Sequence, residues 1–171
     1  MIDYTYLEET SPWLWTFAKY EDIPDILALT KSQYENEITG LYTPDPDWFV
    51  FQLKMAIAEQ EFNFSQEMVA IARDRSSNKL LSYSWITAKN PPLFSRDKTA
   101  EVRIIHIDQS QPKQDKVLQA YQSIDQWIRW SELSKCRILI SSTIRREQQG
   151  FLRIHENMGF VLRGSIAYLK L

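Results

Sequence analysis

Two side chains of this sequence are candidates for exchanging protons with a substrate near neutral pH. One is the carboxylate of Glu101, in the apolar run at 101–106, and the other is the imidazole of His155. A carboxylate can accept a proton, and an imidazole can donate or accept one. Each also has a structural interpretation. Glu101 can form a surface ion pair with Arg103, and His155 can pack at the edge of the core.

Other familiar sites are missing from the sequence. Two His and one Cys do not have the spacing of a zinc site, so we expect no metal. Neither a G-x-S-x-G nucleophile elbow nor a P-loop is present. The run S-S-T at 141–143 can cradle an anion, although hydroxyl residues are common at strand ends. Cys136 precedes an apolar run, which favours a buried structural thiol over a nucleophile.

Charge and composition indicate a globular protein that binds neither nucleic acid nor membrane. The net charge is -2, with 44% hydrophobic and 25% charged residues. The sequence shows no signal peptide and no run of the ~18 apolar residues that a spanning helix needs, so we expect a cytoplasmic protein. The basic residues of the last third are interpreted as solvated helix faces: Lys113, Lys116, Arg145, Arg146 and Arg153.

The elements that must position Glu101 and His155 follow from hydrophobic periodicity and turn residues. Asp22 and Asp45 can cap free N–H groups at helix starts, and Gly159 is the expected left-handed residue after the last helix. The predicted helices are 22–34, 112–134 and 147–158, with a further helix that begins at 46 and has a buried face through 57. The predicted strands are 13–19, 68–73, 80–88, 100–107, 137–142, 160–163 and 165–171, with 137–142 buried.

This order predicts a single α/β domain over 1–171, with residues 1–12 as an N-terminal extension. The expected architecture is α+β in type: a mostly antiparallel mixed sheet with helices on both faces. Strands 100–107 and 137–142 should be parallel neighbours that diverge at their C-terminal ends. Alternation along the first of these strands predicts one face with Glu101, Arg103 and Ile105, and another with Val102, Ile104 and His106.

The element order resembles the GCN5-related N-acetyltransferase (GNAT) superfamily. The run I-H-E-N-M-G-F at 154–160 is similar to the superfamily's L-Y-E-K-x-G-F signature, and E-D-I-P at 21–24 resembles the E-D-x-x-x-I opening of its first helix. The resemblance covers roughly residues 13–171. It implies acyl transfer from the thioester of acetyl-CoA to an amine.

The resemblance implies a cofactor path along strand 100–107 and the turn after it. Backbone groups of Ile105 and Ile107 would contact the pantetheine arm. The superfamily's turn, Q/R-x-x-G-x-G/A, would hold the pyrophosphate at a helix N-terminus, because glycine lets phosphate approach the backbone closely. Here the turn reads Q-P-K-Q-D-K at 111–116.

Two positions of this turn depart from the superfamily pattern. Gln111 fits the first position, but Gln114 and Lys116 replace both glycines. Asp115 adds a negative charge that repels phosphate, which Lys113 and Lys116 can offset electrostatically. The sequence therefore predicts an eroded acetyl-CoA site.

The resemblance also implies catalytic roles. His155 stands where the superfamily has a Tyr that protonates the departing thiolate, and Glu101 stands where some members carry a general base. Gln148, seven residues before His155, replaces an Asn that bonds the cofactor arm.

Two functions remain open at this stage. The first is an N-acetyltransferase that uses acetyl-CoA on an unidentified small amine or protein amine. The second is a catalytically inactive domain of the same fold that serves as a structural or interaction component of a larger assembly. The aromatic N-terminal segment favours contact with a partner protein or a second copy, since its exposed rings would be costly in water: Tyr4, Tyr6, Trp13 and Trp15.

Overall fold

The structure, a computed structural model, describes residues 11–34, 42–89, 95–143 and 148–163. It contains a five-stranded sheet in the order β1-β2-β3-β4-β5. The strands are β1 (Trp13–Phe17), β2 (Glu67–Asp74), β3 (Leu80–Lys89), β4 (Thr99–Ile107) and β5 (Ile138–Ile140). The pairs β1–β2, β2–β3 and β3–β4 are antiparallel, and β5 is parallel to β4. The predicted mixed sheet is therefore confirmed.

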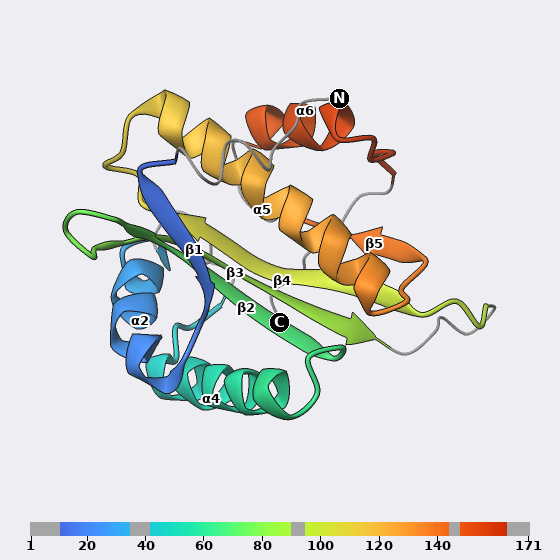
Figure 1. Ribbon diagram of the computed structural model, residues 1–171, viewed down its shortest axis with the longest axis horizontal. Coiled ribbons are helices and arrows are strands. Elements are labelled where there is room, and N and C mark those ends of the chain that lie inside the picture. Colours follow the sequence, from blue (N-terminus) through green and yellow to red (C-terminus); the bar gives the residue numbers. More distant parts are fainter. Residues whose placement is uncertain (1–10, 35–41, 90–94, 144–147, 164–171) are drawn as a thin grey trace.

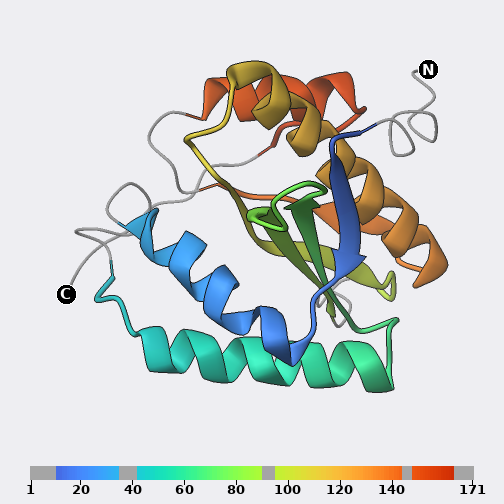
Figure 2. The same cartoon turned by 60° about the vertical axis from the view of Figure 1, so that its left-hand side comes forward.

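Helices cover both faces of this sheet, as predicted (Figures 1 and 2). Helices α2 (Ile23–Lys31) and α4 (Pro46–Phe62) lie on one face, and α5 (Lys113–Leu133) and α6 (Gln149–Asn157) lie on the other. Each layer buries its own apolar core against the sheet. The result is a single α+β domain. None of the helices within the described segments is long and apolar enough to cross a membrane.

The helix ends show which of the predicted capping residues are confirmed. The side chain of Asp45 accepts a hydrogen bond from the backbone N–H of Trp48, as expected for a cap at the start of α4. Gly159 follows α6 with a φ of +90°, which confirms the predicted left-handed position. Asp22 does not cap α2, contrary to the prediction. A 3-10 turn, η1 (Tyr20–Asp22), precedes the helix, and the carboxylate bonds the N–H of Lys19 instead.

Strand β4 carries a bulge that changes which side chains share a face. The pairing with β3 skips Arg103, which is therefore the extra residue. Beyond it, Ile105 packs in the same core as Val102, beneath α5. Ile104 packs in the other core, beneath α2 and α4. The predicted alternation, which placed Ile105 on the face of Glu101, is wrong because one inserted residue exchanges the two faces.

The C-terminal part of the sheet also differs from the prediction. Strand β5 is shorter than the expected 137–142, and Ile138 and Ile140 are exposed rather than buried. Residues 160–163 have no regular secondary structure, so the strand predicted there is wrong. The strand predicted at 165–171 lies outside the described residues. Edge strands of this length gain little from sheet pairing alone, so their extent depends on neighbouring segments.

Two of the N-terminal aromatic rings fold back onto their own chain. Trp13 is only 2% exposed, and its Nε1 donates a hydrogen bond to Oε1 of Gln122 in α5. Trp15 is half-buried and donates to the same oxygen. The ring of Trp13 is therefore buried within its own chain, and that of Trp15 is partly so. Tyr4 and Tyr6 lie outside the described residues, and their docking stays a prediction.

Candidate active site

Strands β4 and β5 part at Glu101. They pair in parallel at three positions, and Glu101 with Ile140 is the last of these. Strand β4 then continues to Ile107 beside β3, while the chain after β5 runs through Ser141 without regular structure (Figure 1). The predicted parallel neighbours and their divergence are confirmed. Beyond Glu101, β5 no longer follows the backbone of β4. An extended ligand laid along β4 would need this separation of the two strands.

The turn after β4 is held by the carboxylate of Asp108. Its Oδ1 accepts hydrogen bonds from the N–H and the hydroxyl of Ser110 at 2.9 and 2.8 Å, and its Oδ2 lies 2.6 Å from Nζ of Lys79. Partial burial acts to raise the pKa of Asp108, but the hydrogen bonds from Lys79 and Ser110 lower it below its ordinary value. The turn therefore takes its shape from a charged side chain and not from glycine.

Glutamine side chains bond the polar groups around this turn. The carbonyl of Ile107 accepts from Nε2 of Gln33 at 2.9 Å and from Nε2 of Gln109 at 2.7 Å. Nε2 of Gln119 donates to Oε1 of Gln111 at 2.7 Å. The carbonyl of Ile107 and the amide of Gln111, two of the expected cofactor contacts, are thus bonded to the protein itself.

Helix α5 begins without a side-chain cap, after Pro112. The first N–H groups of a helix have no acceptor within it, and the helix dipole favours an anion there. Lys113 and Gln114 are exposed at this end. Lys116 folds back over the turn, and its Nζ donates to the carbonyl of Gln109 at 3.1 Å. An anion at this helix start would therefore find two ammonium groups nearby, one of them already bonded to the turn.

His155 is enclosed at the junction of α6 with the sheet. Its Nδ1 lies 2.9 Å from the carbonyl of Phe151, and its Nε2 lies 2.9 Å from the hydroxyl of Ser141. A carbonyl only accepts, so Nδ1 carries the proton and Nε2 of the neutral ring accepts from Ser141. Burial lowers the pKa of His155, and the hydrogen bond to Phe151 offsets this in part. The ring also contacts Phe160 edge-on. This environment matches the structural interpretation of the residue.

A row of polar side chains crosses the sheet at the point where β4 and β5 part. Glu67 pairs with Thr87, and Thr87 pairs with Glu101. The carboxylate of Glu67 accepts from Thr87 at 2.7 Å and from Nε1 of Trp85 at 2.6 Å. Burial raises the pKa of Glu67, against the lowering effect of these hydrogen bonds and of Arg103. The carboxylates of Glu67 and Glu101 therefore lie in one row across the strands, on the face of the sheet that α4 covers.

Solved structures of known acetyltransferases share this architecture. The aminoglycoside antibiotic 6'-N-acetyltransferase AAC(6')-Ih from Acinetobacter baumannii is 14% identical, with a TM-score of 0.67 over 93% of this chain and 97% of that one. Glucosamine-6-phosphate N-acetyltransferase from Arabidopsis thaliana is 11% identical, with a TM-score of 0.66 over the same shares. The aminoglycoside N-acetyltransferase AAC(6')-Iy, solved in complex with CoA, is 13% identical, with a TM-score of 0.68 over 93% and 94%.

The chain has the GNAT fold. No protein-family model matches the sequence, and no curated protein matches it. The likeness to acetyltransferases is therefore a likeness of structure, at identities where only the fold is shared.

Within the GNAT fold, the residues predicted from the sequence come from the elements that border the parting of β4 and β5. Glu101 lies where the parting begins, and Gln148 is the half-buried N-cap residue of α6. The remaining predicted cofactor residues lie along β4 or at the start of α5: Ile105, Ile107, Gln111, Lys113, Gln114 and Lys116. His155 is on α6, 3% exposed, with both ring nitrogens bonded to the protein. The roles of these residues stay predictions.

Two residues of the candidate site were not assigned to it from the sequence. Glu67 stands at the start of an apolar strand, a signal that the sequence offers, but its register opposite Thr87 depends on a bulge between β2 and β3. Ser141 was set aside because serine is common at strand ends. Its contact with His155 spans fourteen positions of sequence.

Proposed function

We propose that this protein is an N-acetyltransferase that moves the acetyl group of acetyl-CoA to an amine. The observation that carries the proposal is the parting of β4 and β5 at Glu101. It leaves the backbone of β4 uncovered by β5 on a path that ends at an uncapped helix N-terminus. A thioester with an extended arm and a terminal pyrophosphate fits a strand followed by such a helix start.

The residues at the helix start fit the charged part of this cofactor. Lys113 is exposed beside the first turn of α5, and Lys116 can exchange its bond to the carbonyl of Gln109 for a phosphate oxygen. Asp115 opposes this charge. The helix start therefore supports binding through its N–H groups and ammonium groups, without the close approach that glycine provides.

The acid–base roles follow from position. Acetyl-CoA supplies the activated acyl group when bound. Glu101, at the point where the strands part, takes the proton that the attacking amine loses as its nitrogen bonds to the acyl carbon. The C–S bond of the thioester breaks, and the CoA sulfur leaves as a thiolate that takes its proton from water. His155 is assigned to positioning and not to protonation of the departing thiolate, because its neutral form carries the proton on Nδ1, which bonds to Phe151. The imidazole instead holds the hydroxyl of Ser141.

A second candidate function is supported by the same turn. Gln114 and Lys116 put side chains where the superfamily has glycines, and the carbonyl of Ile107 already accepts two hydrogen bonds. These features fit a catalytically inactive domain that keeps the GNAT fold for contact with other proteins.

Titration calorimetry with acetyl-CoA and with free CoA separates the two functions. If the protein is an acetyltransferase, we expect micromolar binding of both ligands. We also expect amine-dependent release of a free thiol when the protein and acetyl-CoA are mixed with a panel of small amines and peptides. A folded protein that binds neither ligand would rule out the acetyltransferase and leave the inactive domain. Binding without thiol release from any amine in the panel would separate a CoA-binding protein from an enzyme.

A further inference from the structure

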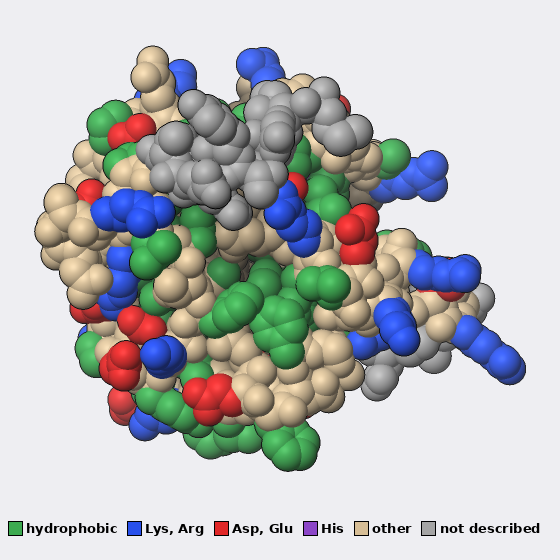
Figure 3. Space-filling view, in the orientation of Figure 1, with side chains coloured by type: hydrophobic (Ala, Val, Ile, Leu, Met, Phe, Trp, Pro, Cys, Tyr) green, Lys and Arg blue, Asp and Glu red, His purple; other side chains and the backbone are tan. Residues whose placement is uncertain are grey.

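Helix α4 presents a second apolar face to solvent, opposite the one that it buries. Its inner face, with Leu53, Ala56 and Ile57, packs in the core. On the outer side, large apolar side chains stay exposed: Trp48 at 59%, Phe51 at 51%, Met55 at 57% and Phe62 at 91%. Hydrophobic side chains gather at this edge of the molecule, below α4 (Figure 3). We call Trp48, Phe51, Met55, Ala58 and Phe62 the outer stripe.

The spacing of the outer stripe is that of a coiled-coil seam. Its members follow one another at intervals of three, four, three and four residues. This heptad pattern keeps one line of side chains facing a neighbouring helix over the whole length of α4. A helix that only covered its own core would be polar on this side. The same spacing marks any apolar helix face, and a second helix is one occupant that it fits.

The area of the stripe fits an interface. Large side chains bury ~200 Å² each, so four of them at these exposures present on the order of 500 Å². A standard interface covers about 800 Å² per partner, of which about 65% is apolar in homodimers. The stripe thus supplies the apolar share of a homodimer interface, with polar residues at its rim.

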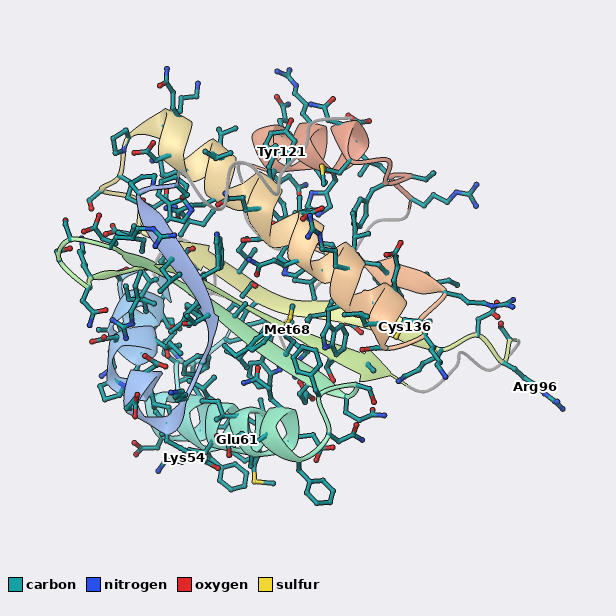
Figure 4. All side chains as sticks on the ribbon, in the orientation of Figure 1. Lys54, Glu61, Met68, Arg96, Tyr121 and Cys136 are labelled. Atoms are coloured by element: carbon teal, nitrogen blue, oxygen red, sulfur yellow. The ribbon has the colours of Figure 1, made fainter. Side chains whose placement is uncertain are left out.

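We propose that α4 is the contact surface of a homodimer, in which α4 of one copy packs antiparallel against α4 of a second copy. The charges beside the stripe complement each other in this arrangement. Lys54 and Glu61 are exposed on the same flank of α4, one heptad apart (Figure 4). When Phe51 faces Phe62 of the second copy, and Met55 faces its Ala58, the two-fold axis also brings Lys54 opposite Glu61 twice.

Other registers and the parallel arrangement pair these charges less well. If the second helix is shifted by one heptad, so that residues nearer the N-terminus meet, Lys54 faces Lys54 of the second copy and Asp47 faces its Glu61. A parallel pair would set Lys54 against Glu59, but Glu59 is half-buried, and its charge contributes to the raised pKa of Glu67 inside the molecule. Antiparallel packing also aligns the helix dipoles favourably.

The first test measures self-association. Sedimentation velocity of the full chain, over a series from low to high micromolar concentration, should show a monomer–dimer equilibrium. Met55→Glu and Phe62→Glu should each raise the dissociation constant by about tenfold or more, since each sets a charge in the seam. The matched control is Leu133→Glu on α5, which changes an equally apolar side chain that is 75% exposed and should leave the dimer intact. Circular dichroism checks that each variant is folded.

The second test addresses the register. Lys54→Glu alone, or Glu61→Lys alone, should weaken the dimer by about tenfold, because each creates two like-charge contacts. The double variant Lys54→Glu/Glu61→Lys should recover wild-type affinity. In a parallel dimer it would not recover, because the changed residue 54 would still oppose Glu59.

The proposal is overturned by a wild-type protein that stays monomeric at every concentration, or by a dimer indifferent to the seam variants. Failure of the double variant to recover affinity would overturn the antiparallel register. A monomer that sediments with phosphatidylcholine vesicles would assign the outer stripe to a lipid surface instead, and would equally refute the homodimer.

Discussion

The hydroxyl oxygen of Ser141 lies 2.9 Å from Nε2 of His155. This contact joins the end of β5 to helix α6. The second ring nitrogen, Nδ1, lies 2.9 Å from the carbonyl of Phe151, one turn earlier in the same helix. The imidazole therefore holds two elements together, and its neutral form satisfies both partners without an added proton.

The stability of the protein should fall as pH drops below about 6.5, in part through His155. Burial lowers the pKa of His155 below the ordinary 6.5, so the unfolded chain binds a proton more tightly than the folded one. The contribution is complete above pH 6.5 and is lost as pH falls toward the folded-state pKa. Urea unfolding at pH steps from 6.5 downward gives the free energy of unfolding at each pH. We expect this free energy to change steeply with pH for wild type and less steeply for His155→Gln.

Ser141→Ala is the control for this experiment. It removes one hydrogen bond of the imidazole, at ~1 kcal/mol, but keeps the titrating group. Its pH slope should therefore stay close to that of wild type. A His155→Gln variant with an unchanged slope would mean that other groups carry the pH dependence.

The two carboxylates of the polar row should respond differently to neutralisation. If the protein transfers acetyl groups, Glu101→Gln should lower kcat by about 10²-fold or more, with little change in acetyl-CoA affinity, because it removes the base. Glu67→Gln should have a smaller effect, since both carboxylate oxygens of Glu67 are engaged by Trp85 and Thr87. Steady-state kinetics with calorimetry checks both variants. A larger loss for Glu67→Gln would make Glu67 the base, a role that its raised pKa suits.

Restoring glycines to the turn should strengthen CoA binding. Gln114→Gly with Lys116→Gly opens the helix start to phosphate oxygens, and we expect close approach to its N–H groups to outweigh the loss of the Lys116 ammonium. We expect about tenfold tighter binding of CoA in calorimetry, at a stability cost of about 1 kcal/mol per glycine.

A pair of alanines at the same two positions separates the effect of the long side chains from the effect of the Cβ atoms. Gln114→Ala with Lys116→Ala removes the long side chains but keeps Cβ atoms, so it should gain less affinity than the glycine pair. Wild-type protein that already binds CoA tightly, with a weaker glycine variant, would contradict the steric interpretation of this turn.

Trp13 should be essential to the stability of the isolated chain. Trp13→Ala should destabilise the fold by about 3–5 kcal/mol, because it empties a buried site and removes the bond to Gln122. Leu14→Ala, at the exposed neighbouring position of β1, should change stability by no more than about 0.5 kcal/mol. Thermal melts of the two variants give the comparison. Equal effects would mean that Trp13 is not part of the core.

Local sequence signals predicted most elements of the fold. Asp45 and Gly159 mark helix ends because a cap needs only residues within one turn of it. The strand–helix–strand order around α5 predicted the parallel pair β4 and β5, since such crossovers are right-handed and place their strands in one sheet. The candidate residues of the cofactor turn follow from this order together with the resemblance to the superfamily.

The environments of the candidate site residues depended on distant contacts. The bulge at Arg103 shows itself only against β3, and it decides which side chains share a face with Glu101. The proton on His155 is placed by Phe151 and by Ser141 from another element. No local pattern encodes the bulge or the contact with Ser141.

The sequence by itself thus determined the order and most of the boundaries of the helices and strands, because these depend on residues a few positions apart. Only the tertiary structure decided which apolar surfaces are buried. Trp13 is buried against Ala72 and Leu81 of distant strands and bonds Gln122, whereas Trp48 stays exposed on a helix whose other face fills the core. Periodicity reports that a face is apolar, but what covers that face is a property of the packed chain.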